Sequence, residues 1–361
     1  MLRPLLALAL APLALAACSS SGTSGSTTTS SATSSGQSGA GGAGGAGTGG
    51  ESAATASSGS SGASSSTGQG GGTASNRGFP VGSPWVSFYG SATGVDLART
   101  AATFRVINID VDPDAANVTD AEIQALRAGG QNRVISYLNV GSCENYRSYW
   151  DTDPPGHKSC KSSGAMTAPY DGYPDEKWAD LSNKAYQDLI VNHVAARLAA
   201  RGIDGFFLDN LEVVEHGASE TNGPCGPACS QGGLDLIWEL RQKFPELLIV
   251  MQNATSDVTR LGKTHGVDYP SILDGVSHEE VYTKGTDPTI LTEMLTWKKM
   301  GLMVNGRPFW LAAEDYVGTC GKPSKSEADG IYAKAKADGL NEYVTDASAS
   351  QQGPCFWSDF Q

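Results

Sequence analysis

Short apolar, β-branched runs alternate with segments of helical period over most of the chain. The runs have the length of buried strands, and the segments between them repeat apolar residues every three to four positions. The pattern predicts strands at Trp85–Tyr89, Phe104–Asp110, Arg133–Val140, Ile203–Asp209, Leu247–Asn253, Ile272–Val281, Pro308–Ala313 and Glu342–Thr345. It predicts helices at Thr119–Ala128, Ser182–Ala200, Leu234–Phe244, Ser256–Thr264, Pro288–Lys299 and Lys325–Ala337.

Eight strands with intervening helices predict an α/β fold, a (β/α)8 TIM barrel with parallel strands buried on both faces. The short link between the first two strands leads us to expect a reduced or absent first helix. A doubly wound open sheet is the alternative. It is disfavoured because no Gly-x-Gly-x-x-Gly follows the first strand and no complete phosphate loop is present.

The first residues have the order of a secretory signal: a positive charge at Arg3, an apolar run from Leu5 to Leu15, and then small residues before Cys18. The run is shorter than the roughly 20 residues that span a bilayer. Leu15-Ala16-Ala17-Cys18 resembles the lipobox of bacterial lipoproteins, which implies a signal peptide over 1–17 and lipidation of Cys18. An ordinary cleaved signal is the alternative. Ser19 is not the Asp of inner-membrane retention, so we expect an anchor in the outer membrane where the host has one.

Residues 18–78 are almost entirely Gly, Ser, Ala and Thr, and hold only two charged residues, Glu51 and Arg77. Such a segment buries too little apolar surface to offset its conformational entropy, so we expect a disordered linker. As a flexible coil of roughly 60 residues it would span about 40–45 Å. The folded domain is expected over 79–361.

The expected domain is acidic. The first 78 residues hold two of the 25 Lys and Arg residues and one of the 38 Asp and Glu residues. Residues 79–361 therefore carry 37 acidic and 23 basic side chains, a net charge of −14. This balance argues against a nucleic-acid partner and favours a neutral or cationic one.

Six cysteines remain when Cys18 is set aside, and an even number in an exported domain predicts three disulfides. Neighbours in sequence predict the pairs Cys143–Cys160, Cys225–Cys229 and Cys320–Cys355. The alternative is zinc, with Cys225-Gly-Pro-Ala-Cys229 as half a site. No second Cys or His pair has ligand spacing, so we expect no metal.

Polar, mostly acidic residues close the predicted strands. In a barrel of this kind, reactive groups stand at the carboxyl ends of the strands. Helix capping would account for one or two such carboxylates but not for a ring of them. The closing residues are Asp110, Asn139 with Glu144 and Arg147 beyond it, Asp209 and Asn210, Gln252 and Asn253, Glu279 and Glu280, and Glu314, Asp315 and Tyr316.

Opposed carboxylates without a metal pattern indicate glycoside hydrolysis, in which one acid protonates the leaving oxygen and one carboxylate attacks or activates water. Asp209 is the first candidate, because it follows four apolar residues and stands where burial ends. An N-cap is its alternative role. Glu279 or Glu280 is the second candidate; they alternate in direction, and the pattern favours neither. Tyr89, Tyr137, Trp150, Tyr282 and Tyr316 could stack on sugars or simply pack.

Several stretches of the domain resemble glycoside hydrolase family 114, the endo-α-1,4-polygalactosaminidase family of (β/α)8 barrels. The resemblance covers nearly all of the domain, and the segment closing on Asp209 is the most specific. The stretches are Val134-Ile135-Ser136-Tyr137-Leu138-Asn139-Val140-Gly141 with Glu144, Tyr146 and Arg147; Trp178-Ala179-Asp180-Leu181; Gly202-Ile203-Asp204-Gly205-Phe206-Phe207-Leu208-Asp209-Asn210; Gln252-Asn253-Ala254; and Asp274-Gly275-Val276 leading to Glu279-Glu280.

The resemblance implies a catalytic pair, Asp209 and Glu279, and so favours Glu279 over Glu280 as the second catalytic residue. We prefer Glu279 as the acid and Asp209 as the base or nucleophile, with inverting or retaining chemistry left open. The resemblance also implies a cleft lined by Asp110, Glu144, Arg147 and Asn253. The full set expected to contact substrate is Asp110, Tyr137, Glu144, Arg147, Asn210, Asn253, Tyr282 and Glu314.

The family's substrate is a galactosamine polymer, partly free amine and cationic, which agrees with the acidic domain. We therefore expect an endo-acting, cofactor-free, monomeric hydrolase of such a polysaccharide at the cell surface. Two segments depart from the family pattern: the insert from Asp151 to Tyr173 and the Cys225–Cys229 loop. Both are expected to lie beside the cleft and to reshape it. The alternatives are a non-catalytic polysaccharide-binding lipoprotein with the same barrel and a metal-dependent deacetylase or esterase.

Overall fold

The computed structural model describes residues 77–80, 82–284, 287–347 and 351–357. The signal peptide, Cys18 and almost all of the linker lie outside these residues. Among the residues described, no helix combines the length and apolarity needed to cross a bilayer.

Eight parallel strands form one sheet in the order β1-β2-β3-β7-β8-β11-β14-β15. The indole Nε1 of Trp85 in the first strand donates to the carbonyl of Asn341 in the last, at 3.0 Å, so the sheet is nearly closed. The predicted (β/α)8 barrel is confirmed. The strands are β1 (Trp85–Phe88), β2 (Val106–Ile109), β3 (Arg133–Asn139), β7 (Gly205–Asp209), β8 (Leu248–Gln252), β11 (Gly275–Glu279), β14 (Trp310–Val317) and β15 (Asn341–Asp346).

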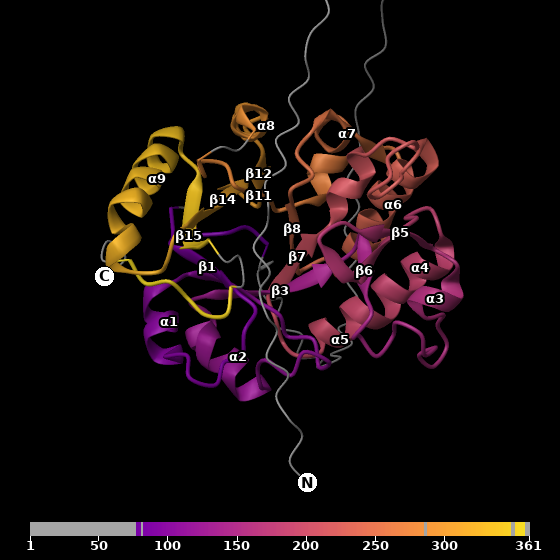
Figure 1. Ribbon diagram of the computed structural model, residues 1–361, viewed down its shortest axis with the longest axis horizontal. Coiled ribbons are helices and arrows are strands. Elements are labelled where there is room, and N and C mark those ends of the chain that lie inside the picture. Colours follow the sequence, from indigo (N-terminus) through magenta and orange to yellow (C-terminus); the bar gives the residue numbers. More distant parts are fainter. Residues whose placement is uncertain (1–76, 81, 285–286, 348–350, 358–361) are drawn as a thin grey trace, which may run out of the picture. The chain divides into compact units, whose positions relative to one another are not determined.

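Helices surround the strands (Figure 1). Thr119 caps the second helix, α2 (Asp120–Arg127), through a capping box with Glu122. The long predicted helix is one helical segment with a π-helical centre, and its chain leaves through Gly202 in the left-handed region. The helices are α1 (Leu97–Thr103), α2 (Asp120–Arg127), α4 (Lys184–Asp188) with η2 (Leu189–Val194) and α5 (Ala195–Ala199), α6 (Pro227–Lys243), α7 (Asp257–Arg260), α8 (Pro288–Lys299) and α9 (Lys325–Asp338).

Two helix predictions need correction. The helix predicted at Ser256–Thr264 ends at Arg260, because the chain turns at Gly262 into a small hairpin of β9 (Lys263–Thr264) and β10 (Val267–Asp268). The helix predicted from Leu234 begins seven residues earlier, at Pro227, next to the Cys225–Cys229 disulfide. The first helix is present but short, at seven residues.

An antiparallel sheet that the pattern did not predict follows β3. It has the order β4-β6-β5 and consists of β4 (Ser142–Glu144), β5 (Met166–Tyr170) and β6 (Tyr173–Ala179). The Cys143–Cys160 disulfide ties β4 to the short helix α3 (Cys160–Ser163) within this insert. All three predicted disulfides are present.

The remaining short elements connect these parts. They are η1 (Ala128–Gly130), η3 (Leu211–Glu215), η4 (Tyr269–Ile272), η5 (Lys322–Ser324), β12 (Met303–Val304) and β13 (Arg307–Pro308).

Aromatic rings fill the barrel near the starts of β1 and β14. Trp85 lies 5.3 Å from Trp310, 5.7 Å from Tyr343 and 6.1 Å from Phe207, measured between ring centroids. Parallel strands buried on both faces need apolar residues at successive positions, and Phe206, Phe207 and Leu208 of β7 are all fully buried. These rings close the barrel interior at this end, and the ends of the strands that carry reactive groups in such barrels are the carboxyl ends.

Candidate active site

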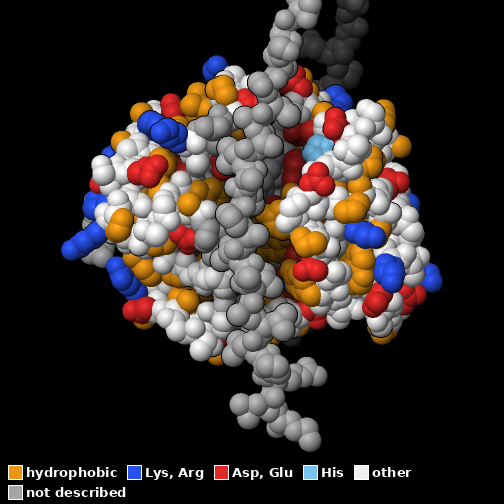
Figure 2. Space-filling view, viewed as in Figure 1, with side chains coloured by type: hydrophobic (Ala, Val, Ile, Leu, Met, Phe, Trp, Pro, Cys, Tyr) orange, Lys and Arg blue, Asp and Glu red, His pale blue; other side chains and the backbone are white. Residues whose placement is uncertain are grey.

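A cavity of about 410 Å³ opens at the carboxyl ends of the barrel strands. It is large enough for a small ligand or part of a chain. On the face in Figure 2, acidic side chains are visible close to the middle, while most Lys and Arg side chains lie toward the edge. The cavity is lined by Tyr89, Asp110, Tyr137, Glu144, Tyr146, Arg147, Tyr170, Gly172, Tyr173, Pro174, Asp175, Glu176, Asp209, Asn210, Gln252, Asn253, Glu279, Tyr316 and Gln351.

Asp209 is the last residue of β7 and reaches the cavity between buried strands. Burial raises the pKa of Asp209 to about 8, with further increases from the negative charges of Glu279 and Glu176. The carboxyl of Asp209 therefore holds its proton near neutral pH. A buried acid next to other carboxylates is the arrangement that separates an acid from a base at one pH.

The turn after Asp209 depends on a glycine in the neighbouring loop. Asn210 adopts the left-handed conformation, with φ of 59°. Gly141, just beyond β3, packs against it so closely that a Cβ there would lie 1.7 Å from the Asn210 carbonyl oxygen. Only glycine permits this approach, which holds the two strand ends together beneath the cavity.

Glu279 closes β11, and hydrogen-bond donors surround its carboxylate. Asn253 Nδ2 donates to Oε2 at 2.8 Å, and the Tyr316 hydroxyl donates to Oε1. The Asn253 Oδ1 also accepts from the Glu279 backbone N–H at 3.0 Å, which fixes the amide of Asn253. These donors hold the carboxylate in one orientation. Asp209 is the member of the pair with a raised pKa, whereas the sequence led us to prefer Glu279 as the acid.

The structure separates the Glu279-Glu280 doublet. Glu279 lines the cavity, whereas Glu280 has a positive φ of 55° and an exposed side chain outside the lining. The backbone N–H of Glu280 donates to the Glu314 carbonyl at 2.7 Å, which continues the pairing of β11 with β14.

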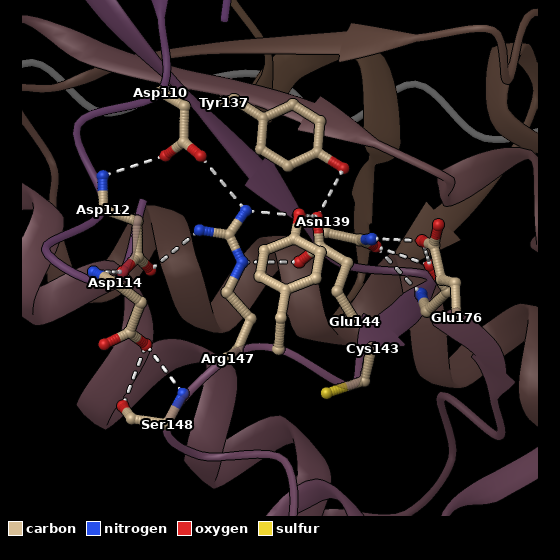
Figure 3. Close-up of polar contacts among 12 residues, drawn as sticks. Asp110, Asp112, Asp114, Tyr137, Asn139, Cys143, Glu144, Arg147, Ser148 and Glu176 are labelled. Carbon is tan, nitrogen blue, oxygen red and sulfur yellow. Dashed lines mark hydrogen bonds and ion pairs between the residues drawn. The ribbon is translucent and has the colours of Figure 1, made fainter. Parts of the chain in front are cut away.

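Arg147 organises the opposite wall of the cavity (Figure 3). Its guanidinium donates from Nε to Glu144 Oε2 at 2.7 Å and from Nη2 to Asp110 Oδ2 at 3.1 Å. The Tyr146 hydroxyl donates to Glu144 Oε1 at 2.9 Å. Asp110 keeps a raised pKa of about 6, because burial outweighs the opposing effect of Arg147. Two of the wall's carboxylates are therefore matched by one buried cation.

Two residues predicted to contact substrate do not line the cavity. Glu314 is fully buried, and both of its carboxylate oxygens lack a hydrogen-bond partner among the described residues. The prediction fails because β14 continues to Val317, so the residue that reaches the cavity is Tyr316. Tyr282 turns away and donates from its hydroxyl to Asp338 at 2.9 Å.

The other predicted residues, Asp110, Tyr137, Glu144, Arg147, Asn210 and Asn253, all line the cavity. Of the two departures, the insert reaches it through Tyr170, Gly172 and Tyr173. The Cys225–Cys229 loop contributes no lining residue. Asn222, which precedes this loop, contacts the insert: its side-chain oxygen accepts from the Asp171 backbone N–H at 3.1 Å and from the indole of Trp178.

Glu176 is one of the cavity residues that the sequence did not predict. It lies in β6, in the insert rather than at the end of a barrel strand. Trp178 could have indicated the direction of Glu176, because side chains two residues apart in a strand point to the same face of the sheet. Trp178 is buried, so Glu176 faces inward with it while Asp175 and Lys177 are exposed.

Possible metal ligands gather at a place apart from the cavity. In the part of the chain that the structure describes, Cys320, Asp346 and Cys355 are the one group close enough together to share an ion. The two cysteines form a disulfide and offer no thiolate, and the group lies outside the cavity lining.

Comparison with known proteins finds one matching family by sequence and several related folds. A family model for glycoside-hydrolase family GH114 matches residues 67–268, more than half of the chain. A Deinococcus radiodurans protein is 27% identical over 205 residues, covering 53% of this chain and 61% of that protein, so the chain spans less than two thirds of this relative. A Thermotoga maritima protein is 22% identical over 275 residues, covering 72% and 79% of the two chains.

Two solved structures share the fold. The glycoside hydrolase domain of PelA from Pseudomonas aeruginosa superposes with a TM-score of 0.55 at 16% identity, covering 74% of this chain and 96% of that one. Ega3 from Aspergillus fumigatus, solved in complex with galactosamine, has a TM-score of 0.56 at 16% identity and covers 80% and 98%. At this identity the likeness concerns the barrel alone.

Proposed function

The chain belongs to glycoside-hydrolase family GH114, and we propose that it is an endo-acting hydrolase of an α-1,4-linked galactosamine polysaccharide. The observation that carries the proposal is that Asp209 and Glu279 line one cavity and interact electrostatically there. Such a pair supplies a proton to the leaving oxygen and a carboxylate to the reacting carbon or to water.

The surroundings of the pair support this chemistry. Asn253 and Tyr316 hold the Glu279 carboxylate from two sides, so its orientation is set before a substrate enters. The raised pKa of Asp209 lets its carboxyl hold a proton near neutral pH. Tyr89, Tyr137, Tyr146 and Tyr173 offer aromatic faces in the lining on which sugar rings can stack.

The test is cleavage of a galactosamine polymer by the purified chain, followed by reducing ends and product size. We expect internal cuts that yield oligomers. Asp209→Asn and Glu279→Gln should each reduce the rate by about 10²-fold or more, because each removes a group that transfers a proton or stabilises charge in the transition state. Chelator should leave the rate unchanged, which distinguishes hydrolysis from metal-dependent deacetylation.

Glu280→Gln is the matched control, since it removes the same charge one residue away and outside the cavity. Its rate should equal that of the wild type. Polymer binding without reducing ends in the wild type, unchanged in both pair variants, would contradict the proposal and favour a polysaccharide-binding protein.

We also propose that the protein is exported and anchored through lipidated Cys18, in the outer membrane where the host has one. The proposal is supported by the small-residue cleavage sequence before Cys18 and the Gly/Ser-rich segment after it. The partner would then be a polysaccharide of the cell envelope, and the acidic domain would suit a cationic one.

A further inference from the structure

Glu176 presents one carboxylate oxygen to the cavity without a partner. Its Oε1 accepts hydrogen bonds from Asn210 Nδ2 at 2.7 Å, from Asn139 Nδ2 at 2.5 Å and from the Ser142 hydroxyl. Its Oε2 has no hydrogen-bond partner in the part of the chain that the structure describes, and in Figure 3 it points away from these donors. The three hydrogen bonds to Oε1 fix the orientation of the carboxylate and therefore the direction in which Oε2 points.

The charge of Glu176 is also unmatched. The wall acids Asp110 and Glu144 both pair with Arg147. No Lys, Arg or His nitrogen of the described residues lies within 4.0 Å of Glu176. Burial of a carboxylate costs free energy, and the three neutral donors on Oε1 offset this only in part, since burial still raises the pKa of Glu176. A cationic group of a bound ligand would supply the missing partner.

The position of Glu176 relates it to the reacting sugar. Its carboxylate accepts a hydrogen bond from Asn210, the residue next to Asp209, and both carboxylates line the same cavity. Tyr170 and Tyr173 from the same hairpin also line the cavity, and Tyr170 stacks on Trp178 with 4.1 Å between ring centroids. The hairpin therefore brings an anion and aromatic faces to the same side of the cavity, the combination that suits an amino sugar.

We propose that Glu176 is a specificity-determining residue that binds the protonated 2-amino group of an unacetylated galactosamine residue next to the Asp209–Glu279 pair. The inference rests on the proposed function and adds a residue that selects between free and acetylated amines. An ammonium donates a charge-assisted hydrogen bond to Oε2, whereas an acetamido group is neutral and bulkier, so its bond is weaker.

The experiment compares kcat/KM of the full chain on two α-1,4-linked oligosaccharides that differ only in N-acetylation. The wild type should prefer the free amine. Glu176→Gln should reduce the ratio of kcat/KM on the amine substrate to kcat/KM on the acetylated one by about ten- to a hundredfold, mainly through KM on the amine substrate, whereas any effect through the pKa of Asp209 falls equally on both substrates. A glutamine can still accept the three bonds made by Oε1, so the cavity wall is retained; a thermal melt checks this.

Glu246→Gln is the matched control, because it removes the same charge from an exposed residue just before β8, at the opposite end of that strand from the cavity. It should show the wild-type preference. A wild type without amine preference, or equal losses on both substrates in Glu176→Gln, would overturn the inference while leaving hydrolysis intact. Failure of the wild type to cut either substrate would contradict the proposed function instead.

Discussion

The two catalytic candidates differ in their immediate surroundings. Asp209 and Glu279 are both carboxylic acids at strand ends, yet burial raises the pKa of Asp209 to about 8 while Asn253 and Tyr316 donate to Glu279. The same chemical group thus has two different surroundings within one cavity. Composition alone cannot assign them, because the difference lies in the neighbours.

The raised pKa of Asp209 predicts a pH-dependent effect on stability. An acid with a higher pKa when folded stabilises the fold below its unfolded pKa of about 4, and this contribution is lost as the pH rises toward about 8. Asp209→Asn cannot ionise. We therefore expect the variant to exceed the wild type in free energy of unfolding by about 1 kcal/mol or more at pH 8, with little difference at pH 4.

Urea unfolding at several pH values measures this difference. Glu279→Gln is a second test variant, because the charge of Glu279 is the largest cause, after burial, of the raised pKa of Asp209. This variant should weaken the pH dependence of stability without abolishing it. Parallel stability curves for the wild type and Asp209→Asn would show that Asp209 ionises normally.

The insert is the element that most changes the site. Its β4-β6-β5 sheet supplies Glu144, Tyr170, Tyr173 and Glu176 to the cavity, whereas Asp209 and Glu279 come from barrel strands. The Cys143–Cys160 disulfide and the Asn222 side chain hold it in place. One wall of the cavity therefore depends on a covalent link outside the barrel.

Removal of that link should affect both stability and activity. The disulfide closes a separation of 17 residues, for which loop-closure entropy predicts a loss of about 3 kcal/mol in free energy of unfolding after Cys143→Ser with Cys160→Ser. Hydrolysis should fall as well, because the hairpin carries cavity residues. Chemical denaturation and kcat/KM measure the two effects.

The Cys225–Cys229 pair provides the comparison, since it closes a separation of only four residues. Its double serine variant should lose about 2 kcal/mol and keep more activity, because none of this loop lines the cavity. A larger loss of activity here than at Cys143–Cys160 would contradict the role given to the hairpin.

The whole molecule combines an acidic domain with an N-terminal segment of different composition. Residues 79–361 carry a net charge of −14, which would attract a cationic polymer and repel nucleic acid. The Gly/Ser-rich residues before them are expected to act as a tether, with a reach of about 40–45 Å from Cys18.

The proposed anchor predicts the behaviour of one variant. Cys18→Ser removes the thiol that would be lipidated, so the protein should move from the membrane fraction to the soluble or detergent-poor phase. Fractionation of cells that express the wild type and the variant measures this, with incorporation of labelled fatty acid as a second readout. Equal partitioning of both proteins would contradict the anchor and favour an ordinary cleaved signal.

The sequence by itself determined the barrel, its strand order along the chain and most of the cavity. Periodicity marks strands such as Phe206–Leu208 because parallel strands buried on both faces must be apolar throughout. Asp209, Asn253 and Glu279 were predictable because they close such strands. Neighbouring cysteines also indicated all three disulfides.

Only the tertiary structure decided where individual side chains point and which of them share an environment. It showed that β14 runs on to Tyr316 and buries Glu314, that Tyr282 turns to Asp338, and that Glu176 reaches the cavity from an insert. Local patterns record the period of an element. Strand ends, the packing of an insert and the pKa of Asp209 depend on contacts between residues far apart in the chain, which no local pattern contains.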